Sequence, residues 1–165
     1  MAETVGLASG ILTLSVFAFK SSSKLHRTIQ ELGGQPRQIR DILTELTALN
    51  LVLRELTETG DISLGVDLSA LKLTLEQCKR ACDEVATELQ PYCTRSDQDK
   101  ARFRDWVKLK WSSGDGMEGF RQQLIGYKST IVVALSFANL TVWCKLLGMI
   151  PLTDTYTQSR ICEYN

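Results

Sequence analysis

Apolar residues recur at alternating steps of three and four positions in four separate stretches of the chain. In the clearest stretch, between Pro36 and Gly60, these positions are Ile39, Ile42, Leu46, Leu49, Leu53 and Leu56. This spacing places all six on one side of an α-helix, whereas a half-buried strand would alternate apolar and polar residues. The stretch therefore predicts an amphipathic helix that packs within a larger helical assembly.

The other three stretches follow the same rule. One begins after Asp67, a suitable N-cap, and ends before Pro91, with the positions Leu68, Leu71, Leu75, Cys78, Cys82, Val85 and Leu89. The last stretch contains Phe120, Leu124, Tyr127, Ile131, Ala134 and Ala138. The first contains Leu7, Ile11, Leu14, Ala18, Ser21, Leu25, Thr28 and Leu32, followed by two glycines.

A shorter helix is expected at residues 99–111, "DKARFRDWVKLKW", between the last two long stretches. Four long helices, one short helix and no strand pattern predict an all-α, up-and-down bundle. We place this bundle in residues 1–144, a length that supports one sizeable core. The seam stops after it and Pro151 interrupts the remainder, so residues 145–165 are expected to form a poorly ordered tail.

Residues 4–19 contain no charged side chain. A secretory signal would carry basic residues before its apolar part, but the first one here is Lys20, and no A-x-A-like cleavage site follows. Sixteen helical residues rise only about 24 Å, less than the roughly 30 Å of a bilayer core. The run therefore predicts neither a cleaved signal nor a permanent membrane span.

The first helix is instead predicted to be apolar on nearly all sides along its first half. Besides its seam it has a second apolar stripe, formed by Val5, Ala8, Leu12, Val16 and Phe19. Gly6 and Gly10 lie on a third face, at the small-xxx-small spacing that lets helices approach closely in lipid. Such a helix is either buried on all sides or meets lipid at some stage.

Catalytic, cofactor and metal sites are not predicted. His26 is the single histidine, and no nucleophile motif lies near it in sequence. Cys78 and Cys82 fall on the seam of their helix and are expected to pack as small hydrophobic residues. The glycines of "GDGMEG", residues 114–119, match a dinucleotide-binding pattern, but a basic and aromatic segment precedes them where that site needs a strand.

Charge and cysteine content indicate the environment of the protein. Nineteen basic and nineteen acidic residues give a formal net charge of zero, so no overall positive field would attract nucleic acid. The five cysteines form no regular framework, which favours a reducing compartment. We therefore expect a cytoplasmic protein that binds neither nucleic acid, nor a cofactor, nor a small-molecule substrate.

The predicted short helix combines basic and aromatic residues, namely Lys100, Arg104, Trp106, Lys108 and Trp111. A basic amphipathic helix with tryptophan suits a membrane surface. The simpler interpretation, which we prefer, is that the aromatic residues pack on the bundle and the basic residues are solvated. Nucleic-acid binding is a weaker third alternative because the chain is neutral overall.

Four segments of the chain together resemble a known family: "MAETVGLASGILTLSVFAFKSSSKLHRTIQ", "VDLSALKLTLEQCKRAC", "FRDWVKLKW" and "GFRQQLIGYKSTIVVALSFANL". The chain resembles, over about residues 1–140, the fungal HeLo-like N-terminal domain, a family also named after the azaphilone pigment biosynthesis cluster protein L. The resemblance implies a helical N-terminal domain of fungal receptor-like (STAND) signalling proteins. In the better-studied HeLo relatives, which are cell-death effectors, an apolar N-terminal helix is freed on oligomerisation and inserts into membrane.

That resemblance assigns the membrane and self-association role to the first helix, with Gly6 and Gly10 as close-approach positions. The residues expected to carry it are Val5, Gly6, Gly10, Leu12, Val16 and Phe19. The expected function is a non-enzymatic signalling or effector domain, with copies of itself, other proteins and an anionic membrane as partners. Two alternatives stay open: an adaptor bundle whose first helix is permanently buried, and an enzyme tied to pigment biosynthesis.

Overall fold

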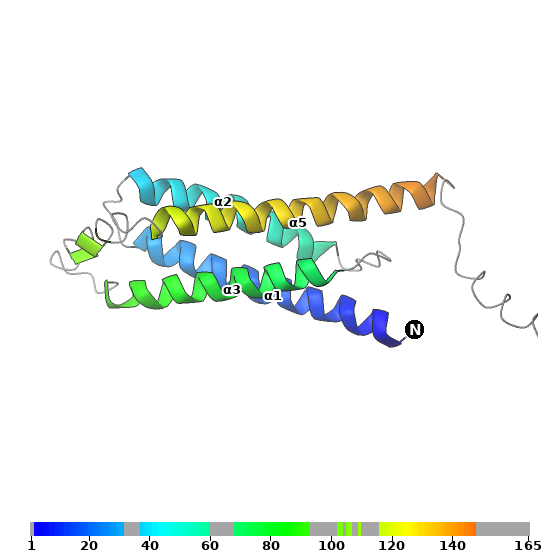
Figure 1. Ribbon diagram of the computed structural model, residues 1–165, viewed down its shortest axis with the longest axis horizontal. Helices are drawn as coiled ribbons and strands as arrows, with labels where there is room; N and C mark the ends of the chain where they lie inside the picture. Colours follow the sequence, from blue (N-terminus) through cyan, green and yellow to red (C-terminus); the bar gives the residue numbers. More distant parts are fainter. Residues whose placement is uncertain are drawn as a thin grey trace, which may run out of the picture.

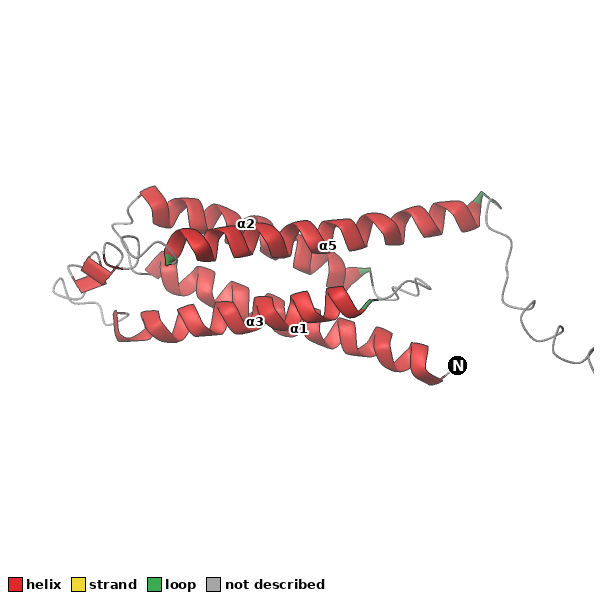
Figure 2. Ribbon diagram, viewed as in Figure 1, coloured by secondary structure: helices red, strands yellow, loops and turns green. Residues whose placement is uncertain are grey.

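The computed structural model describes residues 2–31, 37–59, 68–92 and 116–147, together with residues 102, 103, 105, 106 and 109. The elements are α1 (Ala2–Glu31), α2 (Arg37–Glu58), α3 (Ser69–Leu89), the 3₁₀ helix η1 (Gln90–Tyr92) and α5 (Met117–Leu146). No strand occurs within these described ranges (Figure 2). The prediction of an all-helical fold is therefore confirmed.

The predicted set of four long helices and one short helix is matched only in part. The four long helices are present, but most of residues 99–111 lies outside the described residues, and the five that are described there have helical backbone. The 3₁₀ helix η1 is not predicted by the sequence pattern. It follows α3 where Gln90 donates its backbone N–H to the Thr87 carbonyl, the tighter pattern that often ends an α-helix.

The start of α3 also differs from the prediction. Leu68 occupies the N-cap position and makes no side-chain capping hydrogen bond, and the expected cap, Asp67, lies outside the described residues. The first bond of the helix runs from the Lys72 N–H to the Leu68 carbonyl at 3.0 Å. The described helix therefore begins without a side-chain hydrogen bond from its N-cap residue.

Helices that follow one another in the chain point in opposite directions, as expected for an up-and-down bundle (Figure 1). Their order around the bundle differs from their order in the chain. α1 packs against α2 and α3, and α5 packs against the same two helices. α1 and α5 therefore occupy opposite corners, and the consecutive helices α2 and α3 are not major packing partners.

The predicted seams form the core. All six seam positions of α2, from Ile39 to Leu56, are fully buried. Cys78 and Cys82 are also fully buried, which confirms that they pack as small hydrophobic residues. On α1 and α5 the buried seam residues are Ile11, Ala18, Ser21, Leu25, Phe120, Leu124, Ile131 and Ala138.

α1 and α5 are longer than their neighbours. Each has 30 residues, against 22 in α2 and 21 in α3, which makes them about 12 Å longer at 1.5 Å per residue. The first turns of α1 and the last turns of α5 extend past α2 and α3 at the same end of the bundle (Figure 1). On α5 the buried face ends at Ala138, because Val142, one turn further on that face, is 55% exposed. We call residues 139–147 the α5 overhang.

Candidate functional site

The second apolar stripe of α1 is partly open. Leu12 is 37% exposed, and Val16 and Phe19 are half-buried. Val5 and Gly6 lie outside the residues whose side chains the structure describes. The described part of the predicted stripe is thus neither sealed in the core nor freely exposed.

Gly10 does not mark a close approach within the bundle. A Cβ placed on it would meet no other atom within 4 Å. Packing among the described residues therefore gives no reason for glycine at this position. Any need for a small residue here would have to come from contacts beyond the described residues.

The far end of the stripe lies in a shallow groove between α1 and α2. Phe19 lines this groove together with Ser23, His26, Thr47, Asn50, Leu51 and Arg54. Its polar contacts are the Ser23 hydroxyl to Asn50 Oδ1 at 3.3 Å and His26 Nε2 to Thr47 Oγ1 at 3.0 Å. Partial burial lowers the pKa of His26 below its usual value, which favours the neutral ring.

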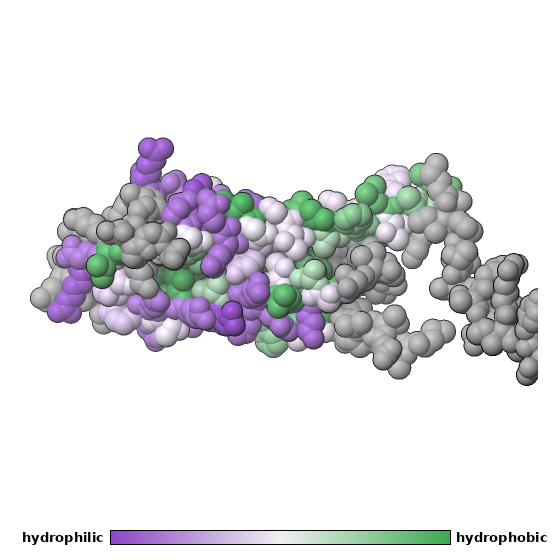
Figure 3. Space-filling view, in the orientation of Figure 1, coloured by the Kyte–Doolittle hydropathy of each residue, from purple (hydrophilic) through white to green (hydrophobic). Residues whose placement is uncertain are grey.

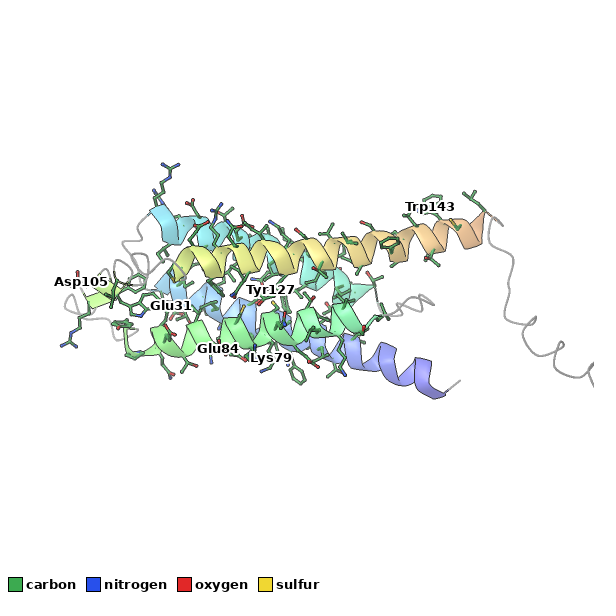
Figure 4. All side chains as sticks on the ribbon, viewed as in Figure 1. Glu31, Lys79, Glu84, Asp105, Tyr127 and Trp143 are labelled. Atoms are coloured by element: carbon green, nitrogen blue, oxygen red, sulfur yellow. The ribbon has the colours of Figure 1, made fainter. Side chains whose placement is uncertain are left out.

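The opposite side of α1 packs on α3 through small and polar residues. The Cys82 pKa is raised well above its usual value, first by a hydrogen bond with Cys78 and then by burial. Its neighbour Ser22 is fully buried, and the Ser22 hydroxyl interacts with the thiol but makes no hydrogen bond of ordinary geometry. Burial also raises the pKa of Tyr127, which lies between α5 and α3 (Figure 4). These groups are therefore neutral near pH 7, as expected of core packing rather than of an activated nucleophile.

An ion pair lies beside this packed face. Lys79 Nζ is 2.8 Å from Asp83 Oδ2 on the same helix. Burial alone would raise the pKa of the Asp83 carboxyl, but the hydrogen bonds from Lys79 and Ser21 bring it below its usual value. Among the described residues, no cluster of three histidine, cysteine or acidic side chains could hold a metal ion.

Of the five residues in the predicted basic and aromatic surface, the structure describes only Trp106. Trp106 is half-buried against the core and lies 6.0 Å from Phe103 and 6.1 Å from Tyr92, measured between ring centroids. Phe103 itself is 1% exposed. These three rings form an aromatic cluster on the bundle. The other four predicted residues, Lys100, Arg104, Lys108 and Trp111, lie outside the described residues.

Most of the exposed large apolar side chains among the described residues lie on or directly after α5, where the sequence pattern predicts no site. Six large apolar side chains of α5, and Leu147 directly after it, are 43–63% exposed. We call these seven the α5 apolar surface: Val132, Val133, Phe137, Leu140, Val142, Trp143 and Leu147. Hydrophobic residues gather over the C-terminal half of this helix in Figure 3. Trp143 points away from the bundle in Figure 4. Monomeric proteins seldom leave contiguous apolar patches larger than several hundred Å² exposed.

A signal for this surface is present in the sequence. Residues 129–144 contain no charged side chain, so this run is as long as the uncharged run at residues 4–19. The spacing of apolar residues identifies only the side chains that face the core and does not predict which side chains face outward. Among the described helices, α5 is long and apolar enough to cross a membrane over Met117–Cys144, and only 17% of its most apolar part is buried.

An ion pair between helices marks the start of the uncharged run. Lys128 Nζ lies 2.7 Å from Glu45 Oε2 on α2, and the two side chains are 27% and 17% exposed. The contact joins residues 83 positions apart in the chain. It fastens α5 to α2 immediately before the apolar part of α5 begins.

Comparison with known proteins identifies one family. The model of the family described as "Pigment biosynthesis cluster protein PigL N-terminal" matches residues 2–146. No curated protein and no solved structure matches the chain. The matched range begins with α1 and ends with α5, so it coincides with the four long helices.

Proposed function

Because the chain belongs to the pigment biosynthesis cluster protein PigL N-terminal family, we propose that it is a non-enzymatic signalling domain of the HeLo-like type. In this proposal the domain associates with itself and engages membranes through α1, in a cell-death or incompatibility response. Its partners are other copies of the chain and an anionic membrane. It resides in the cytoplasm and reaches the membrane on activation.

The observation that carries this proposal is the partly open apolar stripe of α1. Leu12, in the first half of α1, is 37% exposed, and a Cβ on Gly10 would meet no other atom within 4 Å. Both positions fall in the uncharged run of residues 4–19. An apolar helix with open glycine positions suits close association of helices within lipid.

The proposed mechanism is a shift between a closed bundle and a form in which α1 is free. Release exposes the buried seam residues Ile11, Ala18 and Leu25, together with the buried Ile29. Exposing a large aliphatic side chain costs about 1.5–3 kcal/mol, so the free form is rare in water. Lipid or other copies of α1 would offset this cost, which makes release dependent on the partner.

A specific observation favours a second candidate, a protein-binding adaptor with α1 permanently buried. α1 packs against two helices, α2 and α3, and its buried residues extend from Ile11 to Ile29. Phe19, at the end of the stripe, is already half-buried in the groove between α1 and α2. In this alternative the partner would bind an exposed face of the closed bundle.

Dye-loaded anionic liposomes distinguish the two candidates. The purified protein is compared with Gly10→Leu, which blocks close approach, and Leu12→Glu, which places a charge on the stripe. Gln30→Glu, on the exposed polar part of α1, is the matched control. We expect leakage with the wild type and the control, and loss of leakage with the two stripe variants.

Thermal melts accompany these measurements, because a half-buried glutamate at position 12 also destabilises the bundle. Gly10→Leu introduces no charge, and its Cβ would meet no other atom within 4 Å. If the wild type neither binds liposomes nor releases dye under any oligomerising condition, the membrane proposal fails and the adaptor remains.

A further inference from the structure

We propose that the α5 apolar surface is a second membrane-contact element, which lies against an anionic lipid bilayer while the bundle stays closed. This assignment rests on the membrane function proposed above but places the contact on a different helix. It also needs no release of α1, because the side chains involved are already exposed.

The α5 overhang has apolar side chains on both sides. At about 100° per residue, Leu140 and Val142 point in nearly opposite directions. Both are more than half exposed, at 59% and 55%. A folded protein partner would cover one side of such a helix, whereas lipid chains surround it. A helix that is apolar all round and not buried in protein suits a lipid environment.

The placement of the exposed side chains also favours lipid over a protein partner. A stable interface between two proteins buries about 800 Å² on each partner, on one continuous face. At about 100° per residue, six of the seven side chains of the α5 apolar surface fall on one outward face, and Val142 points to the other side. A second copy docked on the outward face would therefore leave Val142, which is 55% exposed, in water. A bilayer covers the whole set.

Hydroxyl groups on this part of α5 do not oppose transfer into lipid, whereas the exposed amide of Asn139 favours a position near the water interface. The hydroxyls of Ser129, Thr130, Ser136 and Thr141 each donate to the backbone carbonyl four residues earlier, at 2.8–3.1 Å. A hydroxyl bonded in this way can lose its water without being left unpartnered. Threonines of α2 and α3 do the same, so this feature permits membrane contact but does not by itself indicate it.

Charge favours an anionic membrane. The chain has no acidic residue between Glu118 and Asp154, and the charged residues in that interval are Arg121, Lys128 and Lys145. Basic residues at the edges of an apolar run are attracted to anionic headgroups. Trp143, which is 63% exposed, precedes Lys145 by two positions, and tryptophan and lysine both favour the membrane interface.

The length of the uncharged run limits the depth of insertion. The range Met117–Cys144 is long enough to span a bilayer, but it includes Glu118, Arg121 and Lys128. Its uncharged part, sixteen residues, rises only about 24 Å, less than a hydrocarbon core of about 30 Å. The α5 apolar surface is therefore expected to lie within the interface or to enter one leaflet, as interfacial helices do.

Trp143 provides a direct probe of this contact. The chain has three tryptophans, so the double variant Trp106→Phe/Trp111→Phe leaves Trp143 as the only one. This protein is mixed with phosphatidylcholine–phosphatidylserine vesicles whose acyl chains are brominated. We expect a blue shift of the Trp143 emission and strong quenching, with quenching reduced in vesicles without phosphatidylserine.

Charge substitutions on the exposed surface complete the test. Val133→Glu and Leu140→Glu change side chains that are more than half exposed, so the fold is retained, and Gln123→Glu on an exposed position of the same helix is the matched control. We expect each surface variant to bind vesicles at least tenfold more weakly and the control to bind as the parent does. The variant Leu12→Glu is expected to keep the quenching of Trp143.

The possible results separate this inference from the proposed function. Dye release without quenching of Trp143 would overturn the α5 contact and leave the role of α1 standing. Quenching that survives Leu12→Glu but is lost in Leu140→Glu would support it. If Trp143 is not quenched and Leu140→Glu converts a dimer to a monomer in sedimentation, the surface is an interface between copies and the inference is wrong. Absence of any vesicle binding would contradict both proposals.

Discussion

Replacing Gly10 by alanine is expected to make the protein more stable. Glycine inside a helix costs about 0.8–1.0 kcal/mol relative to alanine, because the unfolded chain loses more freedom on folding. The cost of adding a methyl group is set by its surroundings, and at Gly10 a Cβ would meet no atom within 4 Å. The full propensity gain should therefore appear as an increase of about 0.8–1.0 kcal/mol in the free energy of unfolding.

Gly126 of α5 is a matched control. It also lies within a long helix, and a Cβ there would also meet nothing within 4 Å. Gly126→Ala should therefore stabilise the protein by a similar amount. Gly10 and Gly126 lie on helices at opposite corners of the bundle, so the double variant should show the sum of the two effects.

Urea denaturation followed by circular dichroism measures these changes. The midpoint should rise with an unchanged m value, and the melting temperature of a chain of this length should rise by about 2–4 °C for each kcal/mol. If Gly126→Ala stabilises the protein while Gly10→Ala is neutral or destabilising, Gly10 contacts another part of the molecule and our reasoning is wrong. If Gly10 also serves association in lipid, Gly10→Ala should lower dye release while raising stability, so loss of activity could not be blamed on unfolding.

Three further predictions concern the bundle itself. Leu46→Ala, at a fully buried position of α2, should lower the free energy of unfolding by about 2–5 kcal/mol in urea titrations, and a smaller loss would mean that the core closes around the cavity. Glu45→Gln removes the partner of the largely buried Lys128 and should lower the free energy of unfolding by about 1–2 kcal/mol. Glu58→Gln, in an exposed pair, should change it by less than about 0.5 kcal/mol. Equal effects of the two variants would refute the role of burial. Because burial lowers the pKa of His26 in the folded state, the unfolded chain binds a proton more readily, so stability should fall as the pH drops through the usual value of 6.5 towards the lowered pKa. His26→Gln should flatten this part of a melting-temperature profile, and an unchanged slope would assign it to another group.

Periodicity alone predicts most of the bundle core. Every seam position of α2 is buried as expected, because one apolar stripe on an amphipathic helix leaves a single face to bury. Periodicity does not predict the outward side chains of α5, such as Val133 and Leu140, because they fall outside the inward seam. The absence of charge in residues 129–144 is the sequence signal that points to them.

The order of helices around the bundle is not predictable in this way. Seams of similar composition can pair in more than one arrangement, and the diagonal placement of α2 and α3 depends on side-chain fit across the whole core. The two uncharged runs, residues 4–19 and 129–144, also look alike in sequence. They differ in their neighbours: Ile11 and Ala18 are covered by other helices, whereas nothing on α5 beyond Ala138 is buried among the described residues.

The two long helices extend past the bundle at the same end, and this gives the molecule a lengthwise asymmetry. Hydrophilic side chains cover much of the opposite half of the bundle in Figure 3, so the protein resembles a surfactant, with an apolar end on a charged body. Above a threshold concentration, surfactant molecules gather with their apolar ends together and their polar ends in water. The clusters are closed and limited in size, because each molecule has only one apolar end. An adhesive patch on two opposite ends would instead allow open-ended fibres. If copies of the protein associate as proposed, this shape should favour small, finite assemblies over filaments.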